Sequence, residues 1–262
     1  MSDTKTAVIT GASSGIGAVY AQRLAAQGYD LLLVARRADR LADLGARLEA
    51  EFGISVQRWI GDLADPADLA RLERRLEEEP VAMLVNNAGA GGLGPTATTG
   101  ADAQEALIRL NVIALTRLSV AALAGFRKAG TGTLVNIASV IAFGPSAGGA
   151  SYSGSKAFVL NFTRSLQMEY ADSDIRIQAV LPGPIRTEFF TSQGLSDSVF
   201  PDTAYLSAEE LVDAALSGLE HGEKVTIPSL GSPAIWDAIE ASRQAFFKDV
   251  LSGQVAERYK GG

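Results

Sequence analysis

A tyrosine and a lysine four residues apart are the side chains of this sequence best suited to moving a proton. Tyr152 and Lys156 lie in the stretch Tyr-Ser-Gly-Ser-Lys, and Ser139 precedes Tyr152 by thirteen residues. If the stretch is helical, the two side chains lie one above the other on one face. A phenol titrates near pH ~10, and a nearby ammonium would lower its pKa toward the range in which general acids work best. Ordinary helices also carry a tyrosine and a lysine at this spacing, so the rest of the sequence must show whether the pair is catalytic.

The composition excludes several other kinds of chemistry. The chain of 262 residues has a net charge of −7 and no basic tract, which argues against a nucleic-acid partner. It has no cysteine, which excludes disulfides, thiolate metal sites and a cysteine nucleophile. The single histidine, His221, lies in a predicted exposed turn, so we expect neither a catalytic triad nor a metal site. Without a signal peptide or a long apolar run, we expect a cytoplasmic protein with no membrane partner.

Short apolar runs alternate with helical patterns along most of the chain. Strands are predicted at 6–10, 30–35, 54–60, 81–85, 133–137, 175–181 and 224–227. Helices are predicted at 18–27, 38–52, 66–79, 102–129, 151–170, 208–219 and 235–251. This alternation demands a mostly parallel, seven-stranded sheet with helices on both faces. No linker divides the chain, so we predict a single doubly wound α/β domain over residues 1–262.

A glycine-rich turn between the first strand and the first helix indicates a phosphate-binding loop. It reads Thr10-Gly-Ala-Ser-Ser-Gly-Ile-Gly17. Glycines permit a tight turn and a close approach to phosphate, and the helix N-terminus offers free N–H groups. The turn departs from the usual G-x-G-x-x-G dinucleotide pattern, because Tyr20 stands at the third position. A glycine-rich turn without a ligand is the alternative.

Two arginines at the end of the second strand predict which dinucleotide binds. Arg36 follows Gly17 by nineteen residues, Arg37 comes next, and no acidic residue occupies this strand end. An acid there would bind the ribose hydroxyls of NAD, whereas an arginine would accept the 2′-phosphate of NADP. We therefore expect NADP(H) as the cofactor. The alternative is a pair of solvent-exposed arginines with promiscuous cofactor use.

Together the motifs resemble those of the short-chain dehydrogenase/reductase family over essentially the whole chain. The resemblance rests on Thr10-Gly-Ala-Ser-Ser-Gly-Ile-Gly17, Asp62-Leu63, Asn86-Asn-Ala-Gly89, Asn111, Ser139, Tyr152-x-x-x-Lys156 and Pro182-Gly183 with Thr187. It implies a Rossmann-type fold and an oxidoreductase that interconverts a carbonyl and an alcohol with NADP(H). The length fits the short members of the family.

The resemblance also implies roles for individual residues. The catalytic set would be Asn111, Ser139, Tyr152 and Lys156. Ser139 would hydrogen-bond the substrate carbonyl, Lys156 would hold the nicotinamide ribose, and Asn111 would hold a water that links Lys156 to solvent. The cofactor-binding set would be Gly11, Ser13, Ser14, Gly15, Ile16, Gly17, Arg36, Arg37, Asp62, Leu63, Asn87, Ala88, Gly89, Tyr152, Lys156, Pro182, Gly183, Ile185 and Thr187.

The stretches that would surround the substrate carry few charges. Beside Ser139 and Tyr152, the candidate walls are Ile141, Phe143, Phe189 and Phe190, with Val140, residues 90–93, Leu195 and Phe200 further out. We therefore expect a small, mostly apolar ketone, aldehyde or alcohol. Glu188 and Asp197 are the charged exceptions. The irregular segment at about 188–207 is predicted to be a mobile lid, with an unimportant surface loop as the alternative.

Two other classes of function stay open at this point. One is a non-catalytic NADPH-binding sensor or scaffold on the same fold, which a turnover assay would separate from an enzyme. The other is an interaction protein that uses the predicted helices at 102–129 and 151–170. Members of the family commonly pair through these helices, so the resemblance implies a homodimer or homotetramer.

Overall fold

The structure is a computed structural model that describes residues 5–194, 196 and 199–260. The chain divides into two compact units, Met1–Pro228 and Ser229–Gly262, which are described separately. The single domain expected over residues 1–262 therefore stays a prediction.

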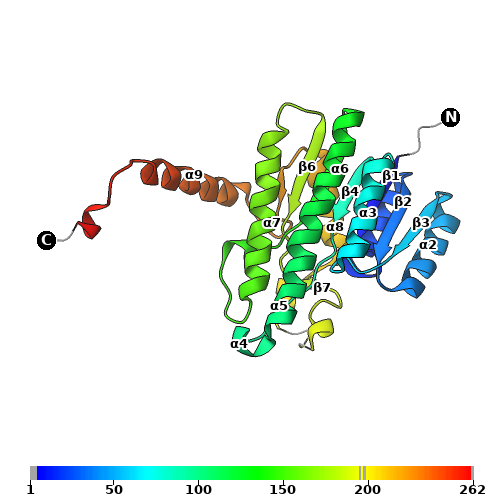
Figure 1. The fold of residues 1–262 in the computed structure, drawn as a ribbon, viewed down its shortest axis with the longest axis horizontal. Coiled ribbons are helices and arrows are strands. Elements are labelled where there is room, and N and C mark those ends of the chain that lie inside the picture. The colour runs from blue at the N-terminus through cyan, green and yellow to red at the C-terminus, as the bar shows by residue number, and fades with distance from the viewer. Residues whose placement is uncertain (1–4, 195, 197–198, 261–262) are drawn as a thin grey trace. The chain divides into compact units, whose positions relative to one another are not determined.

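The first unit is built on a seven-stranded, fully parallel sheet (Figure 1). Its strands are β1 Thr6–Thr10, β2 Asp30–Ala35, β3 Val56–Ile60, β4 Met83–Asn86, β5 Gly132–Ile137, β6 Ile175–Val180 and β9 Val225–Thr226. They lie in the order β3-β2-β1-β4-β5-β6-β9, which confirms the predicted doubly wound fold. The order reverses between β1 and β4, so the carboxyl ends of these strands border the crevice where ligands bind in such folds.

Helices cover both faces of the sheet. One face carries α1 Gly15–Ala26, α2 Ala38–Phe52 and α8 Ala208–Glu220, and the other carries α3 Pro66–Glu78, α6 Leu115–Ala129 and α7 Ala150–Glu169. Alternate strand residues point to opposite faces. In β1, Ile9 packs into the first layer and Val8 into the second. The inner strands, such as β1 and β2, are mostly apolar because both of their faces are buried, whereas the edge strand β3 exposes Gln57 and Arg58.

The predicted single helix at 102–129 is not uniform. After the short α4 Thr96–Thr99, α5 Ala101–Ile108 runs into a π-helical turn, η1 Arg109–Ala114, before α6 begins. The combined helix Ala101–Ala129 is, among the described residues, the one long and apolar enough to cross a membrane. Half of its most apolar stretch is buried, and Leu118 and Phe126 pack against the sheet. We therefore interpret it as a core helix.

The irregular segment after β6 contains more structure than its sequence pattern suggests. The short strand β7 Ile185–Arg186 pairs in parallel with β8 Leu206–Ser207. Between them lie the short helices η3 Thr191–Gln193 and η4 Asp202–Ala204. Leu195 and Asp197 of the predicted lid lie outside the described residues.

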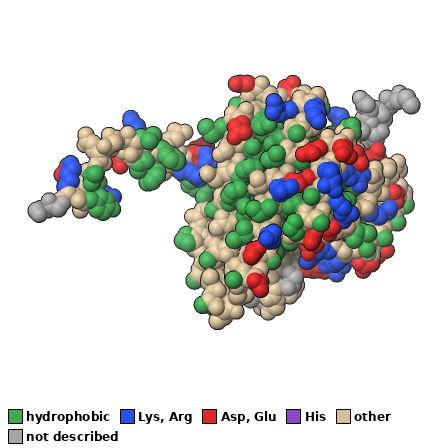
Figure 2. Space-filling model, viewed as in Figure 1, with side chains coloured by type: hydrophobic (Ala, Val, Ile, Leu, Met, Phe, Trp, Pro, Cys, Tyr) green, Lys and Arg blue, Asp and Glu red, His purple; other side chains and the backbone are tan. Residues whose placement is uncertain are grey.

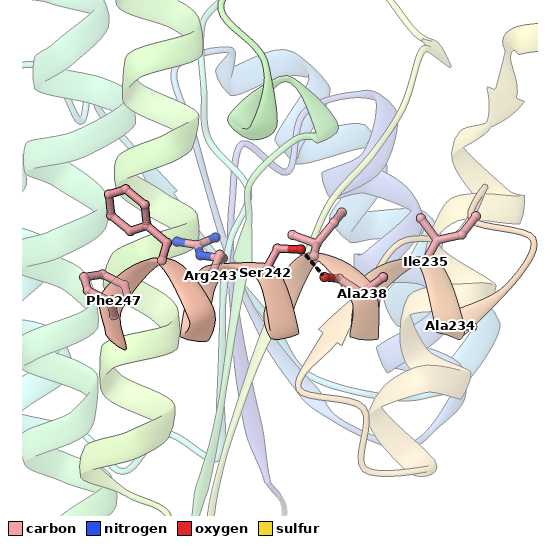
Figure 3. A pocket seen from close by; sticks show the side chains of 8 residues that line it. Ala234, Ile235, Ala238, Ser242, Arg243 and Phe247 are labelled. Atoms are coloured by element: carbon pink, nitrogen blue, oxygen red, sulfur yellow. Dashed lines mark hydrogen bonds between the residues drawn. The ribbon is translucent and has the colours of Figure 1, made fainter. Parts of the chain in front are cut away.

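The second unit consists of α9 Pro233–Val250 and the short helix η5 Glu257–Tyr259. The structure confirms the helix predicted at 235–251. Residues of α9 line a hollow of about 810 Å³. Figure 3 shows their side chains and the hydrogen bond from Ser242 Oγ to the Ala238 carbonyl, at 2.8 Å. None of the residues that line the hollow belongs to the predicted active site.

Candidate active site

Helix α7 brings the phenol and the ammonium together as the sequence predicts. Lys156 is 8% exposed, and its Nζ donates to the Ile137 carbonyl at the end of β5 over 2.9 Å. The same Nζ lies 5.9 Å from the ring centre of Tyr152. The buried ammonium is therefore held between the last residue of a central strand and the phenol.

Ser139 is the second residue after β5 and caps the short helix η2 Val140–Phe143. Its Oγ accepts from the Ile141 N–H and donates to the Pro182 carbonyl, both at 3.3 Å. The hydroxyls of Ser139 and Tyr152 also share a hydrogen bond. Ser139, Tyr152 and Lys156 thus meet at the carboxyl end of β5.

The pKa of Tyr152 moves opposite to our expectation. Burial raises the pKa of Tyr152 to about 12, and the hydrogen bond with Ser139 lowers it by less. Burial also lowers the pKa of Lys156 to about 8. The expected lowering by Lys156 is wrong for the cofactor-free chain, because desolvation of the phenol dominates. At neutral pH the pair is therefore a protonated phenol beside a charged ammonium.

Asn111 lies in the π-helical turn η1 and is 2% exposed. Its Oδ1 accepts from the Ala90 N–H at 2.8 Å, and its Nδ2 donates to the Ala90 carbonyl at 2.9 Å and to Ser155 Oγ at 3.1 Å. Ser155 Oγ in turn donates to the Tyr152 carbonyl at 2.7 Å. Asn111 thus joins the loop after β4 to the turn of α7 that carries Tyr152. Its role as a water ligand stays a prediction.

The glycine-rich turn lies against the loop that follows β4. Gly11 and Gly15 have φ of +68° and +52°, which favours glycine. A Cβ on Gly11 would lie 2.8 Å from Asn87 Nδ2, which donates to the Thr10 carbonyl at 2.9 Å. Ser14, the N-cap of α1, makes no side-chain cap hydrogen bond. The first N–H groups of α1 therefore stay available, and the turn fits a dinucleotide pyrophosphate.

Replacing Gly17 with Ala should destabilise the fold by roughly 1–3 kcal/mol. Its Cβ would lie 2.6 Å from Asn87 Nδ2 and still closer to the Gly11 carbonyl, neither of which can move freely. Urea denaturation measures the change. Gly125→Ala is the matched control, because its Cβ would lie 3.5 Å from the nearest atom, the Leu76 carbonyl oxygen, in mid-helix. We expect the free energy of unfolding of this control to rise by about 0.5–1 kcal/mol. Equal losses of stability in both variants would contradict the close contacts of Gly17.

The two predicted arginines follow β2 and contact the loops that follow β1 and β3. Arg37 donates to Ser13 Oγ at 3.0 Å and 3.1 Å and to Ser14 Oγ at 2.6 Å. Arg36 Nη1 lies 3.6 Å from Asp62 Oδ2, and the neighbouring Leu63 is buried. The structure therefore brings the predicted adenosine-side residues to one edge of the sheet.

The loop after β6 approaches both the glycine-rich turn and Tyr152. In the loop after β6, Thr187 Cγ2 would lie 3.0 Å from a Cβ on Gly15 of the glycine-rich turn. In the loop after β4, a Cβ on Gly89 would lie 3.7 Å from Lys156 Nζ. The Phe189 ring packs on Tyr152 with the ring centres 5.5 Å apart. The remaining predicted cofactor residues lie in or beside the same loops: Ile16, Ala88, Pro182, Gly183 and Ile185.

The predicted substrate walls differ in how they face the site. Ile141 and Phe143 lie in η2, directly after Ser139, and Phe143 is exposed. Phe190 is buried and packs against Phe200 and Tyr205, so Phe189 is the phenylalanine that packs on Tyr152. The expectation that Phe190 also lines the substrate site stays a prediction.

Two residues of the loop after β6 were not predicted to be part of the site. Gln193 Oε1 accepts from the Leu93 N–H at 3.3 Å, and Gln193 Nε2 donates to the Phe189 carbonyl at 2.7 Å. Gln193 thus joins the two loops that flank Tyr152. Glu188 forms ion pairs with Arg37 and Arg40. The one signal in the sequence was that Glu188 is a charge in an otherwise apolar stretch.

Residues 5–197 match the family described as short chain dehydrogenase. A short-chain dehydrogenase from Sphingobium yanoikuyae, solved in complex with NADPH, is 46% identical; the match covers 98% of this chain and 100% of that one, with a TM-score of 0.94. The bulky-bulky ketone specific alcohol dehydrogenase from Comamonas testosteroni is 38% identical, with 99% and 100% covered and a TM-score of 0.90. An NADP-dependent 3-hydroxy acid dehydrogenase from Schizosaccharomyces pombe is 30% identical, with 86% and 90% covered.

Proposed function

The chain belongs to the short-chain dehydrogenase/reductase family, and on that premise we propose that it uses NADP(H) to interconvert a ketone or aldehyde and its alcohol. The observation that carries the proposal is the meeting of Ser139, Tyr152 and Lys156 at the carboxyl end of β5. A protonated phenol, a second hydroxyl and a buried ammonium in one place suit an oxygen that gains negative charge.

Each of these side chains has a separate task. When bound, NADP(H) supplies the hydride for the carbonyl carbon or accepts it from the alcohol. Tyr152 donates its proton to the carbonyl oxygen and takes it back in the oxidative direction. Ser139 hydrogen-bonds to the same oxygen and also fixes the phenol. Lys156 keeps a positive charge behind the phenol and would hold the nicotinamide ribose.

Arg36 and Arg37 support NADP(H) rather than NAD(H). Arg37 after β2 and the hydroxyls of Ser13 and Ser14 in the turn after β1 form a set of polar groups that suits a phosphate. The relative from Sphingobium yanoikuyae was solved with NADPH, which agrees with this assignment.

Arg36→Asp should lower the ratio of NADPH to NADH efficiency by about tenfold or more, because the new carboxylate repels a 2′-phosphate and can accept from ribose hydroxyls. The ratio of kcat/KM with the two cofactors measures the effect. Arg47→Asp is the matched control, because Arg47 is an exposed arginine of α2 outside the predicted site. If the ratio stays constant in Arg36→Asp, the assignment of Arg36 is wrong.

The substrate proposed is a small, mostly apolar carbonyl compound. The walls named above are apolar, and Phe189 offers a ring face beside Tyr152. A panel of aliphatic, aromatic and bulky ketones and aldehydes, each assayed with NADPH and with NADH, tests the substrate class and the choice of cofactor together. The bulky ketones enter the panel because the Comamonas testosteroni relative is specific for them. Absence of turnover across the panel would favour the sensor or scaffold.

We also propose a cytoplasmic homodimer or homotetramer that pairs through the long helix Ala101–Ala129, which includes α6, and through α7. Val120 on α6 and Phe158 and Met168 on α7 are exposed. Figure 2 shows hydrophobic side chains on the face over these helices. Light scattering after size exclusion measures the assembly, and a monomer would contradict the proposal.

A further inference from the structure

Glu188, the residue after Thr187, forms a cluster with two arginines at the adenosine edge of the site. Its Oε2 accepts from Arg37 Nη1 at 2.9 Å. Arg40 Nη1 donates to both carboxylate oxygens, at 2.8 Å and 3.0 Å. These hydrogen bonds lower the pKa of Glu188, so the carboxylate is charged at neutral pH.

Arg37 serves two sets of acceptors at once. One side of its guanidinium donates to the hydroxyls of Ser13 and Ser14 in the glycine-rich turn, and the other donates to Glu188. The first set belongs to the edge where the 2′-phosphate of NADP(H) would bind. The carboxylate of Glu188 therefore already neutralises part of the positive charge that would bind this phosphate.

Glu188 also begins the segment that reaches Tyr152. Phe189, the next residue, packs on the phenol ring, and its carbonyl accepts from Gln193 Nε2. The arginine pair thus fastens the start of the substrate loop, which we define as residues 188–194, to the cofactor edge.

We propose that Glu188 is a specificity-determining residue for the cofactor: its carboxylate competes with the 2′-phosphate for Arg37 and Arg40, and binding of that phosphate releases the start of the substrate loop. The proposal rests on the proposed use of NADP(H). In this proposal the Glu188 carboxylate occupies the 2′-phosphate site when no phosphate is bound. Binding of the phosphate then frees the start of the substrate loop, which packs on Tyr152.

Charge and exposure both favour this exchange. The Glu188, Arg37 and Arg40 side chains are 51%, 41% and 42% exposed, so the ion pairs are weak and easily replaced. A phosphate carries up to two negative charges and more acceptor oxygens than a carboxylate, so it binds the same arginines more strongly. If both anions shared the arginines, they would repel each other. A nucleotide without the 2′-phosphate has no such competition with Glu188.

Binding of nucleotide fragments to Glu188→Gln tests the competition without any turnover. Adenosine 2′,5′-bisphosphate carries the 2′-phosphate, whereas ADP lacks it, and calorimetry gives both dissociation constants. We expect Glu188→Gln to bind the bisphosphate about threefold to tenfold more tightly and ADP unchanged. Asp213→Asn is the matched control, because it removes a carboxylate from a comparably exposed ion pair with Arg23. Unchanged or weaker binding of the bisphosphate to Glu188→Gln would overturn the proposal.

Hydrogen exchange of the substrate loop tests the release. In the wild-type chain, the bisphosphate should speed exchange of the amides of Phe189, Gln193 and Gly194 at least threefold, and ADP should not. In Glu188→Gln, these amides should exchange fast without ligand. The wild-type chain could prefer the bisphosphate while amide exchange in its substrate loop stays constant. That result would refute the coupling between phosphate binding and the loop, but it would leave the NADP(H) assignment intact. If the wild-type chain binds ADP equally well, the NADP(H) assignment fails and the proposal fails with it.

Discussion

Tyr152→Phe should lower kcat for carbonyl reduction by on the order of 10²–10⁴, with little change in the affinity for NADPH. The substitution keeps the ring that packs against Phe189 and removes the proton that the carbonyl oxygen needs. It also removes the hydrogen bond with Ser139. Steady-state rates and NADPH titration by fluorescence measure the two quantities separately.

Tyr20→Phe is the matched control for this prediction. Tyr20 is fully buried in α1, and its hydroxyl has no hydrogen-bond partner among the described residues. Removing that hydroxyl should leave kcat unchanged and the stability equal or slightly higher. Near-normal turnover by Tyr152→Phe on the best substrate would refute the role of Tyr152.

Lys156→Met should lower kcat/KM by on the order of 10² or more while the protein stays folded. Methionine matches the length of the lysine and removes the charge behind the phenol. The free energy of unfolding at pH 7 should change by less than about 1 kcal/mol, because relief from burying the ammonium offsets the lost hydrogen bond to Ile137. Steady-state kinetics and urea denaturation measure the two effects.

The pH dependence of stability tests the same residue independently. Burial lowers the pKa of Lys156 in the folded chain to about 8, below its value in the unfolded chain. Between the two pKa values the unfolded chain binds more protons, so Lys156 alone should add about 2 kcal/mol to wild-type stability without cofactor between pH 8 and 10. Lys156→Met should lack this gain. Parallel curves for the two proteins would contradict the buried ammonium.

The sequence pattern predicts the sheet well, for a physical reason. Strands buried on both faces, such as β1 and β2, must be apolar along most of their length, and each is followed by a helix that covers one face. The π-helical turn at Asn111 could not be predicted. The residues around Asn111 keep a helical pattern, and the turn widens where the side chain of Asn111 bonds to Ala90, twenty-one residues away in sequence.

The candidate site was predictable where short motifs carry the chemistry. Tyr152 and Lys156 stand at a spacing that a helix converts into contact, and the glycines precede a helix N-terminus. The contacts of Glu188 and Gln193 were not predictable, because they join an irregular loop to residues about 150 and 100 positions away. The raised pKa of Tyr152 also depends on burial, which spacing alone does not reveal.

Transfer of a labelled hydride tests the central claim most directly. NADPH carrying deuterium at both hydrogen positions of the reactive carbon of its nicotinamide ring is given to the wild-type chain with the best ketone of the panel, and the alcohol is analysed by mass spectrometry. We predict deuterium on the carbinol carbon, formed at least 10² faster than by Tyr152→Phe. An alcohol without deuterium, or equal rates in the two proteins, would contradict the account.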